Sequence, residues 1–434
     1  MLPSCNKRQV CEVPPGGGAN EFPAISQSLN VDVFLDGTVS MKGFIVSGLA
    51  SRYQRTLPLL ESSVERGWPG GRVAFYKFGT TVVELPERKY LEAQRTEFYA
   101  GQVLSRDTLI QNVIEQSVAD RLTVILTDLF QKDVDVNLLT NKIKEKYIKH
   151  GLAVGVLAVK SEFAGRVYDV GPNNYAFDYR SDDANAATFR PFYILAFGSH
   201  ADVSKYFDEM LRGGLNALPE TQAVIFSPHL TSRLASFEDS AITEIAKLQQ
   251  VNSLLPTDVA DRRVEQFRIA DGSIPQASFT AKLKYGGLPY TMPMESPELE
   301  AEVVAYMCGT PDGSSGGQQP LLQNDELKRA FAVKDAAVNE STVDFKAEVT
   351  PAFLPGTGIY SFRVILRPKE YKSPSWFKEW NMDMGQVEAW KKSPRDFNGA
   401  TTFNLEAFLT NLWATSQQLH RPKVAEFYCY IKRD

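Results

Sequence analysis

Three oxygen-bearing side chains lie at alternate positions of one short segment, where they could bind a metal ion. Asp36, Thr38 and Ser40 follow the apolar run Val31–Leu35 in the string Phe-Leu-Asp-Gly-Thr-Val-Ser. If the run is a parallel strand, they lie at its carboxyl end, where open α/β folds bind ligands. Carboxylate and hydroxyl oxygens suit a hard divalent cation such as Mg²⁺ better than a soft metal. The simpler alternative is that Asp36 and Ser40 cap the next helix, because Asp and Ser are good N-caps.

Two more polar residues occur at points of the chain that a sheet could bring to the same place. Asp128 directly follows a second apolar run, Leu122–Thr127, and Thr108 precedes a helical pattern that extends to about residue 118. Because the carboxyl ends of parallel strands meet at one edge of a sheet, these residues would join the first three. The candidate site for Mg²⁺ or Mn²⁺ therefore consists of Asp36, Thr38, Ser40, Thr108 and Asp128.

In order and approximate spacing, these residues resemble the metal-ion-dependent adhesion site (MIDAS) of von Willebrand factor A (vWA) domains. The family pattern is D-x-S-x-S, then a loop threonine, then a T-D pair at the end of the fourth strand. The resemblance covers about residues 30–227, and the hairpin-like segment Arg72–Glu84 is similar to the family's second and third strands. Two positions differ. Thr38 stands where serine is usual, and Leu129 follows the T-D pair where glycine is frequent.

The resemblance implies a function as well as a fold. The hydroxyls of Thr38 and Ser40 would bind the cation, and Thr108 would join them in one state of its loop. Asp36 and Asp128 would neutralise charge, partly through water. One coordination position would stay open for a carboxylate of a partner protein. We therefore expect a metal-dependent protein-binding module and not an enzyme. Because intracellular vWA proteins of bacteria often work beside an ATPase or in larger complexes, we also expect a multiprotein setting.

Two other functions compete with this interpretation. The same string resembles the first motif, D-x-D-G-T, of haloacid-dehalogenase-type phosphatases, whose first aspartate is the covalent nucleophile. Phe34 occupies that position here and has no nucleophilic atom, which argues against a Mg²⁺-dependent phosphohydrolase. The other alternative is a structural subunit whose metal site is non-functional. The sequence contains no phosphate-binding P-loop and no paired-cysteine zinc motif.

Strand and helix patterns alternate between about residues 30 and 227. Nearly continuous apolar runs are typical of parallel strands that are covered on both faces. Leu139, Ile143 and Tyr147 recur every four residues, as on one face of a helix. This alternation predicts a doubly wound, mostly parallel α/β sheet of the vWA or Rossmann-like type. Further strands are expected at Arg72–Phe78, Leu152–Val159, Phe192–Phe197 and Ala223–Phe226, and a helix at Val203–Leu211.

After residue 228 the period of the apolar residues becomes two, which is typical of half-buried antiparallel strands. Phe279, Ala281 and Leu283 fall on one face in this way. We divide the chain into a vWA-like domain at 30–228, which should fold alone, and a mostly β domain with helices at 229–434. An internal linker is expected at about 309–320. Helices are expected at Glu238–Gln250 and Leu405–Leu419, and strands at Phe345–Val349, Tyr360–Leu366 and Phe427–Ile431.

Three tryptophans near the end of the chain lie among lysine and arginine residues. Trp376 and Trp380 have helical spacing, and Trp390 follows them. We interpret them as packing residues of a small core, with a protein-binding surface or a nucleic-acid surface as alternatives. The whole chain carries 47 Lys and Arg against 52 Asp and Glu, a net charge of −5. That balance argues against a nucleic-acid partner.

Length and composition are typical of a soluble globular protein of two or three domains. The chain has 434 residues, of which 43% are hydrophobic and 23% charged. No apolar run approaches the roughly 18 residues that suggest a transmembrane helix, so we expect no transmembrane segment.

The first 29 residues form the expected flexible leader. The opening Met-Leu-Pro-Ser-Cys loosely resembles a lipobox, but no apolar segment precedes it, so we expect a cytoplasmic protein. The alternative is an exported lipoprotein that is anchored at Cys5. In an oxidising compartment Cys5 could pair with Cys11, and Cys308 with Cys429.

Overall fold

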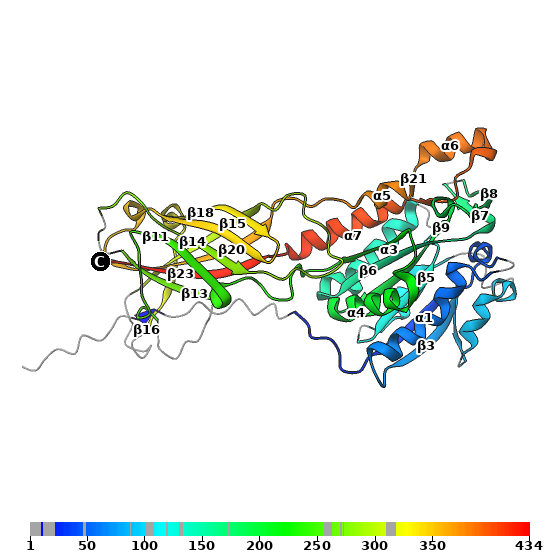
Figure 1. Cartoon of the computed structure of the whole chain (residues 1–434), viewed down its shortest axis with the longest axis horizontal. Coiled ribbons are helices and arrows are strands. Elements are labelled where there is room, and N and C mark those ends of the chain that lie inside the picture. The colour runs from blue at the N-terminus through cyan, green and yellow to red at the C-terminus, as the bar shows by residue number, and fades with distance from the viewer. Residues whose placement is uncertain are drawn as a thin grey trace, which may run out of the picture.

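The computed structural model describes the chain except for residues 1–9, 12–21, 47–48, 87, 101–107, 119, 130–132, 172, 256–262, 270, 272 and 310–317. The described part is elongated, with an α/β half at one end and a half made of two β-sheets at the other (Figure 1). The C-terminus lies at the far end of the β half (Figure 1). Within this part, no helix is long and apolar enough to cross a membrane.

A seven-stranded mixed sheet forms the centre of the α/β half. Its strand order is β10-β6-β9-β5-β2-β3-β4. Only β2 with β3 and β2 with β5 form parallel ladders; the other neighbouring pairs are antiparallel. Consequently β2, β3, β5 and β6 run in one direction, and β4, β9 and β10 run in the other. The bounds are β2 (Asn30–Asp36), β3 (Arg72–Phe78), β4 (Val82–Leu85), β5 (Leu122–Thr127), β6 (Ala153–Ser161), β9 (Arg190–Gly198) and β10 (Thr221–Phe226).

The predicted strands of this half are all present, and the α/β architecture is confirmed. Their directions differ from those of a simple doubly wound sheet, because β9 lies between β5 and β6 and is antiparallel to both. A hairpin of β7 (Ala164–Val170) and β8 (Tyr175–Arg180) separates β6 from β9 along the chain. Every residue of β6 and of β9 is buried. A continuous apolar run therefore reports burial on both faces and carries no information about strand direction.

Helices cover both faces of the sheet. Alternate residues of its strands point to opposite sides, and apolar residues on each side pack against helices. On one face, Val33 and Val124 pack in a cluster with residues of α1 (Arg52–Gly67) and α4 (His200–Met210). On the other face, Phe34 and Ile125 pack with residues of α2, α3 and α7. These helices span Ile110–Gln116, Asp133–Lys146 and Leu405–His420, which confirms the predicted helices in each region.

The β half is built from two sheets that face each other across one apolar core. Its four-stranded sheet has the order β11-β14-β19-β18, and its six-stranded sheet the order β12-β13-β23-β20-β15-β17. The period-2 residues Phe279, Ala281 and Leu283 are completely buried, as expected. The strands are β11 (Ser240–Ala246), β12 (Gln249–Gln250), β13 (Val264–Ile269), β14 (Ala277–Lys284), β15 (Leu299–Cys308), β17 (Leu321–Gln323), β18 (Phe331–Asn339), β19 (Thr342–Val349), β20 (Gly358–Pro368) and β23 (Ala425–Arg433).

The prediction of a helix at Glu238–Gln250 is wrong. This segment forms β11 and β12. Its alanine, glutamate and lysine residues favour a helix, but β11 pairs with β14 and Ile242 packs on the core of the β half. Pairing with a neighbouring strand thus overrides the local preference.

The C-terminal helices return to the α/β half although the sequence places them within the second half. Trp376 and Trp380, on or next to α5 (Ser375–Glu379), are buried in the same cluster as α3. Trp390, on α6 (Met384–Lys392), is buried in the cluster on the opposite face of the sheet. The tryptophans are packing residues, as expected, but they do not form a small core of their own. They lie far beyond residue 228 and complete the core of the α/β half.

This packing predicts the behaviour of a fragment that ends at residue 228. Such a fragment would expose the apolar surface that Phe377, Phe408 and Leu412 cover in the full chain. We therefore expect residues 22–228 to aggregate or to unfold without cooperativity, contrary to the expectation from the sequence. Size-exclusion chromatography and thermal melting against the full chain would measure this. A monomeric fragment whose melting is as cooperative as that of the full chain would contradict it.

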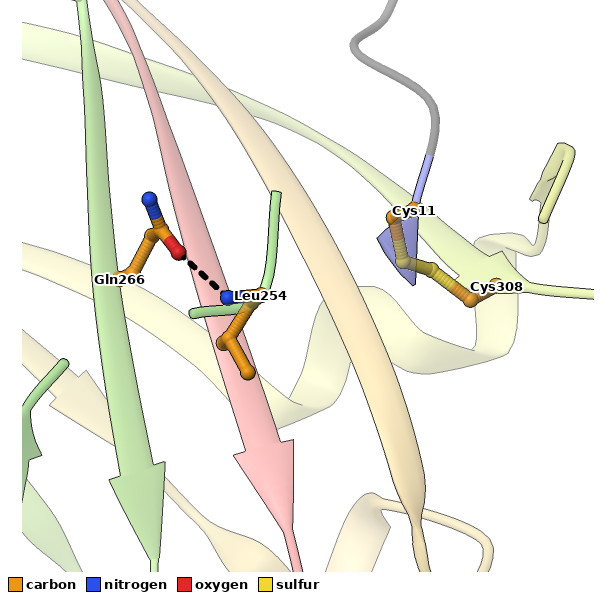
Figure 2. The surroundings of a disulfide bond; sticks show 4 residues. All are labelled: Cys11, Leu254, Gln266 and Cys308. Carbon is orange, nitrogen blue, oxygen red and sulfur yellow. Dashed lines mark hydrogen bonds between the residues drawn. A yellow bond between two sulfur atoms is a disulfide. The ribbon is translucent and has the colours of Figure 1, made fainter. Parts of the chain in front are cut away.

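A disulfide bond joins the N-terminal segment to the β half (Figure 2). It connects Cys11, in the short strand β1 (Val10–Cys11), with Cys308 at the end of β15, and their Cα atoms are 5.9 Å apart. β1 also pairs in parallel with β16 (Gln318–Gln319), and the Cys11 N–H donates to the carbonyl oxygen of Leu254 at 3.2 Å.

The pairing of Cys308 with Cys429 is therefore wrong, because Cys429 is a free thiol buried in the core of the β half. Cys11 is bonded to Cys308, so it does not pair with Cys5, which lies outside the described residues. Distance along the chain could not reveal this bond, which spans 297 residues. Most of the linker expected at about 309–320 also lies outside the described residues.

Candidate metal site

The edge of the central sheet brings the two predicted carboxylates together. Asp36 is the last residue of β2, and Asp128 follows the last residue of β5. β2 and β5 are neighbouring parallel strands, so both side chains leave the sheet at the same edge. Both are essentially without exposure, at 0% and 1%. This edge faces away from the β half, on the side of β7 and β8 (Figure 1).

The three predicted hydroxyls form one hydrogen-bonded group with Asp36. Thr38 Oγ1 donates to Asp36 Oδ1 at 2.6 Å and lies 3.0 Å from Ser40 Oγ and 3.2 Å from Thr108 Oγ1. Because a hydroxyl has one proton, Thr38 accepts from the other two when it donates to Asp36. The Thr38 N–H also donates to Asp36 Oδ1, at 3.0 Å.

A further hydroxyl, missed from the sequence, completes the contacts of Asp36. Thr127 Oγ1 donates to Asp36 Oδ2 at 2.8 Å. The five predicted residues thus lie at one edge of the sheet. Four of them share hydrogen bonds, and Asp128 is close enough for its charge to act on Asp36.

These contacts do not support the alternative in which Asp36 and Ser40 only cap a helix. The next helical segment is the 3₁₀ helix η1 (Val39–Phe44), and its N-cap residue is Thr38. The Thr38 side chain makes no capping hydrogen bond and is directed to Asp36 instead. Ser40 lies inside this helix and contacts Thr38 through its hydroxyl.

The buried carboxylates repel each other. Burial, followed by the charge of Asp128, raises the pKa of Asp36 to about 7, although hydrogen bonds from Thr38 and Thr127 oppose the shift. Asp128 Oδ1 is buried and has no hydrogen-bond partner among the described residues. A buried acceptor without a donor is costly, and a bound cation would satisfy it. These residues therefore fit a hard divalent cation.

The donor set also restricts the kind of metal site. Among the described residues, no group of three or more His, Cys, Asp or Glu side chains could hold a metal ion. A cation at this edge would rely on two carboxylates together with neutral hydroxyls. Such oxygen ligands suit Mg²⁺ or Mn²⁺ and not Zn²⁺.

Arg190 is the charged residue that sequence analysis missed. Its Nη2 lies 3.3 Å from Asp128 Oδ2, and both side chains are 1% exposed. Its Nη1 donates to the carbonyl oxygens of Gly399 and Thr401 at 3.1 and 3.4 Å, and the guanidinium lies 5.4 Å from the ring centroid of Phe163. Arg190 reaches the site because β9 is antiparallel and begins at this edge. A parallel strand, as expected from the sequence, would have placed it at the opposite edge.

The loop after β5 retains a backbone shape that is typical of glycine. Leu129 has a φ of 54°, in the left-handed region that favours glycine. Its N–H donates to Thr127 Oγ1 at 3.2 Å, and its side chain is buried. Leucine thus adopts this left-handed turn conformation at a steric cost of roughly 1–2 kcal/mol.

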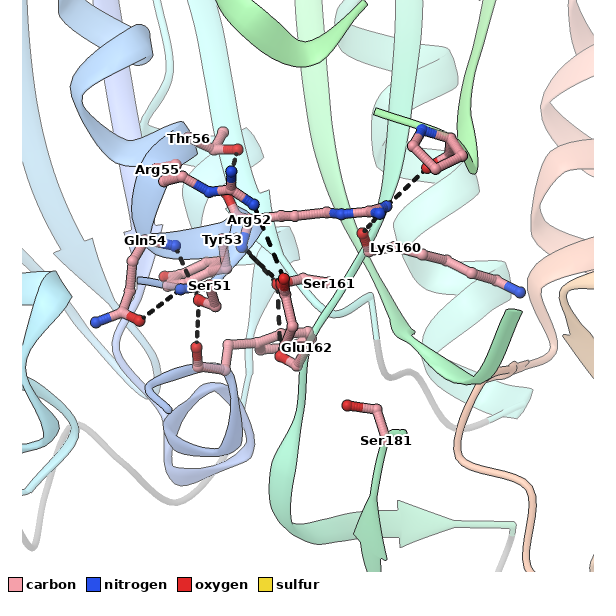
Figure 3. A network of polar contacts seen from close by, with 12 residues as sticks. Ser51, Arg52, Tyr53, Gln54, Arg55, Thr56, Lys160, Ser161, Glu162 and Ser181 are labelled. Atoms are coloured by element: carbon pink, nitrogen blue, oxygen red, sulfur yellow. Dashed lines mark hydrogen bonds and ion pairs between the residues drawn. The ribbon is translucent and has the colours of Figure 1, made fainter. Parts of the chain in front are cut away.

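A polar network anchors helix α1, which follows the candidate site along the chain (Figure 3). Ser51 and Gln54 form a capping box at its start, and the Ser51 hydroxyl donates to the carbonyl oxygen of Phe44 at 2.6 Å. At the end of β6, Glu162 Oε2 accepts from the Arg52 N–H at 2.8 Å, where a carboxylate is favoured by the helix N-terminus. The network ties η1 and α1 to the sheet edge.

Comparisons with known proteins do not identify a family. No family model matches this chain, and no curated protein matches its sequence. The resemblance to vWA domains therefore stays a prediction. The residues described above are the basis for any functional assignment.

Proposed function

We propose that this chain is a metal-dependent protein-binding module. The observation that carries the proposal is the buried pair of Asp36 and Asp128, with an unpartnered carboxylate oxygen beside three converging hydroxyls. A divalent cation would be held there and would offer an open coordination position to a carboxylate of a partner protein. The residues that would hold Mg²⁺ or Mn²⁺ are Asp36, Thr38, Ser40, Thr108 and Asp128.

The charges around the site favour an acidic partner. Arg190 neutralises one of the two buried carboxylates, so the three side chains together carry a single negative charge when Asp36 is ionised to bind a cation. A divalent cation would leave one positive charge uncompensated in a buried environment, which is costly. An incoming carboxylate would remove that excess, whereas a neutral oxygen would not.

The structure argues against the phosphohydrolase alternative. Phe34, at the position of the dehalogenase nucleophile, is 3% exposed, and its ring stacks on Tyr76 with centroids 4.7 Å apart. The second candidate function is a structural subunit with a non-functional metal site. The ion pair of Arg190 with Asp128 favours it, because that pair reduces the negative charge available to a cation.

The disulfide bond supports an oxidising compartment. Structural disulfides persist in secreted and periplasmic proteins and are rare in the cytosol of mesophiles. We therefore propose that the protein is exported and not cytoplasmic. We also propose that its partners belong to a multiprotein complex. Cys5, to which a lipid anchor would be attached in an exported lipoprotein, lies outside the described residues.

A capture experiment with and without chelator tests the proposed function. The immobilised full chain should retain its partner in Mg²⁺, release it in EDTA and recover it in Mn²⁺, and Asp36→Ala should not capture it under any of these conditions. Capture that is indifferent to EDTA and to Asp36→Ala would favour the structural subunit. Mg²⁺-dependent hydrolysis of an aryl phosphate would favour the phosphohydrolase.

A further inference from the structure

We propose that Arg190 is a positioning and specificity-determining residue of the metal site, which weakens its affinity for the cation and makes binding depend on an anionic partner. This inference rests on the proposed function. It deepens that function because it explains why the partner group must be a carboxylate and not a neutral amide or hydroxyl.

The position of Arg190 is fixed from several directions. Its guanidinium contacts the side chain of Asp128, the backbone carbonyls of Gly399 and Thr401, and the ring of Phe163. These residues come from three separate segments of the chain, and the side chain is 1% exposed. The guanidinium group of an arginine carries a positive charge in a folded protein. Arg190 is therefore a permanent, immobile cation beside Asp128.

Arg190 also determines which oxygen of Asp128 is available. It pairs with Oδ2, whereas Oδ1 stays buried without a hydrogen-bond partner among the described residues. An aspartate that is held by one oxygen presents the other in a fixed orientation, which lowers the entropic cost of ligation. The same contact thus orients a ligand and reduces the negative charge of the site.

These two effects have opposite consequences for a divalent cation. Orientation of Asp128 increases its affinity, and the fixed positive charge decreases it. For charges only a few ångströms apart in a buried site, the Coulomb interaction exceeds the usual gain from orientation. We therefore infer that the charge effect dominates, and that a partner carboxylate restores the affinity that Arg190 removes.

The first test compares Arg190→Gln with the charge-conserving variant Arg190→Lys in the full chain. Calorimetric titration with Mn²⁺ should show at least about tenfold tighter binding for Arg190→Gln, with Arg190→Lys close to the wild type. Saturating acetate should tighten Mn²⁺ binding to the wild type and should do so much less for Arg190→Gln. Acetamide, a neutral isostere, should have no effect on either protein.

A charge-rescue experiment tests the same role of Arg190 if the Arg190→Gln protein does not fold. Asp128→Asn should lose Mn²⁺ binding, because Arg190 then cancels the charge of Asp36. The double variant Asp128→Asn with Arg190→Gln contains no buried charge at this pair and restores the net charge of the wild type. It should recover Mn²⁺ binding to within about tenfold of the wild type. A residue with a purely structural role would not produce this rescue.

The Mn²⁺ affinities of the wild type and the variants distinguish a failure of the role of Arg190 from a failure of the proposed function. Mn²⁺ binding to the wild type, combined with unchanged or weaker binding to Arg190→Gln and no rescue in the double variant, would overturn the role of Arg190 alone. Absence of Mn²⁺ binding in the wild type and in every variant would overturn the proposed function and this inference with it.

Discussion

Asp36→Asn is expected to abolish Mn²⁺ binding and, at the same time, to stabilise the metal-free protein at neutral pH. The amide is isosteric and still accepts the hydrogen bond from Thr38, but it lacks the charge that a hard cation requires. Burial and the charge of Asp128 raise the pKa of Asp36 to about 7, so the folded state disfavours its ionised form. The rise from the ordinary value of 3.8 corresponds to roughly 4 kcal/mol, which is an upper bound for the gain in stability of the metal-free protein.

The pH dependence gives this prediction a second readout. The folded-state pKa of Asp36 lies above the ordinary value of 3.8, so between pH 4 and 7 the folded protein binds more protons than the unfolded chain. The contribution of Asp36 to stability is therefore fully present at acid pH and is lost as the pH rises through this window. Urea unfolding in EDTA should show this loss in the wild type and a smaller one in Asp36→Asn.

A second aspartate on the same strand provides a matched control. Asp32 is also buried, but it lies toward the opposite end of β2 and accepts from Arg121 Nη1 at 2.9 Å. Asp32→Asn should leave Mn²⁺ affinity unchanged and should lower stability, because it weakens an ion pair. Equal Mn²⁺ affinities for Asp36→Asn and the wild type would show that Asp36 is not a ligand.

Removal of the disulfide is the second change with a large expected effect. Cys11→Ser should lower the free energy of unfolding by roughly 3–5 kcal/mol, because the bond closes a loop of 297 residues in the unfolded chain. It should also release β1, whose described backbone contacts are few, from its position beside Leu254. Equilibrium unfolding in urea, under oxidising and reducing conditions, measures the loss.

The other cysteines supply the controls for this experiment. Cys308→Ser should have the same effect as Cys11→Ser, and the double variant should be no less stable than either single variant, because both remove one bond. Cys429→Ala should differ, since Cys429 is a free buried thiol and its change creates only a small cavity. A wild-type unfolding midpoint that does not respond to reductant would contradict a stabilising role for the bond.

Periodicity predicted the elements of the fold well where packing and local preference agree. Leu139, Ile143 and Tyr147 are completely buried on one helical stripe, and Phe279 and Ala281 point into the β half. Periodicity failed where long-range contacts determine the type of an element or the direction of a strand. The segment around Ile242 became an edge strand through its partner β14, and the direction of β9 depends on an intervening hairpin that apolar runs do not reveal.

The sequence likewise predicted only part of the candidate site. The strand ends that carry Asp36 and Asp128 could be recognised, because both follow buried apolar runs and a parallel pair places them together. Arg190 could not be recognised, because its contribution requires an antiparallel strand and a segment from near residue 400. The contact of Cys11 with Cys308 likewise depends on the long-range fold, which brings the N-terminal segment beside the end of β15.

We expect a divalent cation to bind between Asp36, Asp128 and the neighbouring hydroxyls. An anomalous difference map from crystals of the full chain grown with Mn²⁺ tests it most directly. The map should show one strong peak within about 2.0–2.4 Å of the hydroxyl oxygens of Thr38 and Ser40, at the edge where β2 and β5 end. A map that shows no peak there at saturating Mn²⁺, or Mn²⁺ bound only at surface carboxylates, would contradict it.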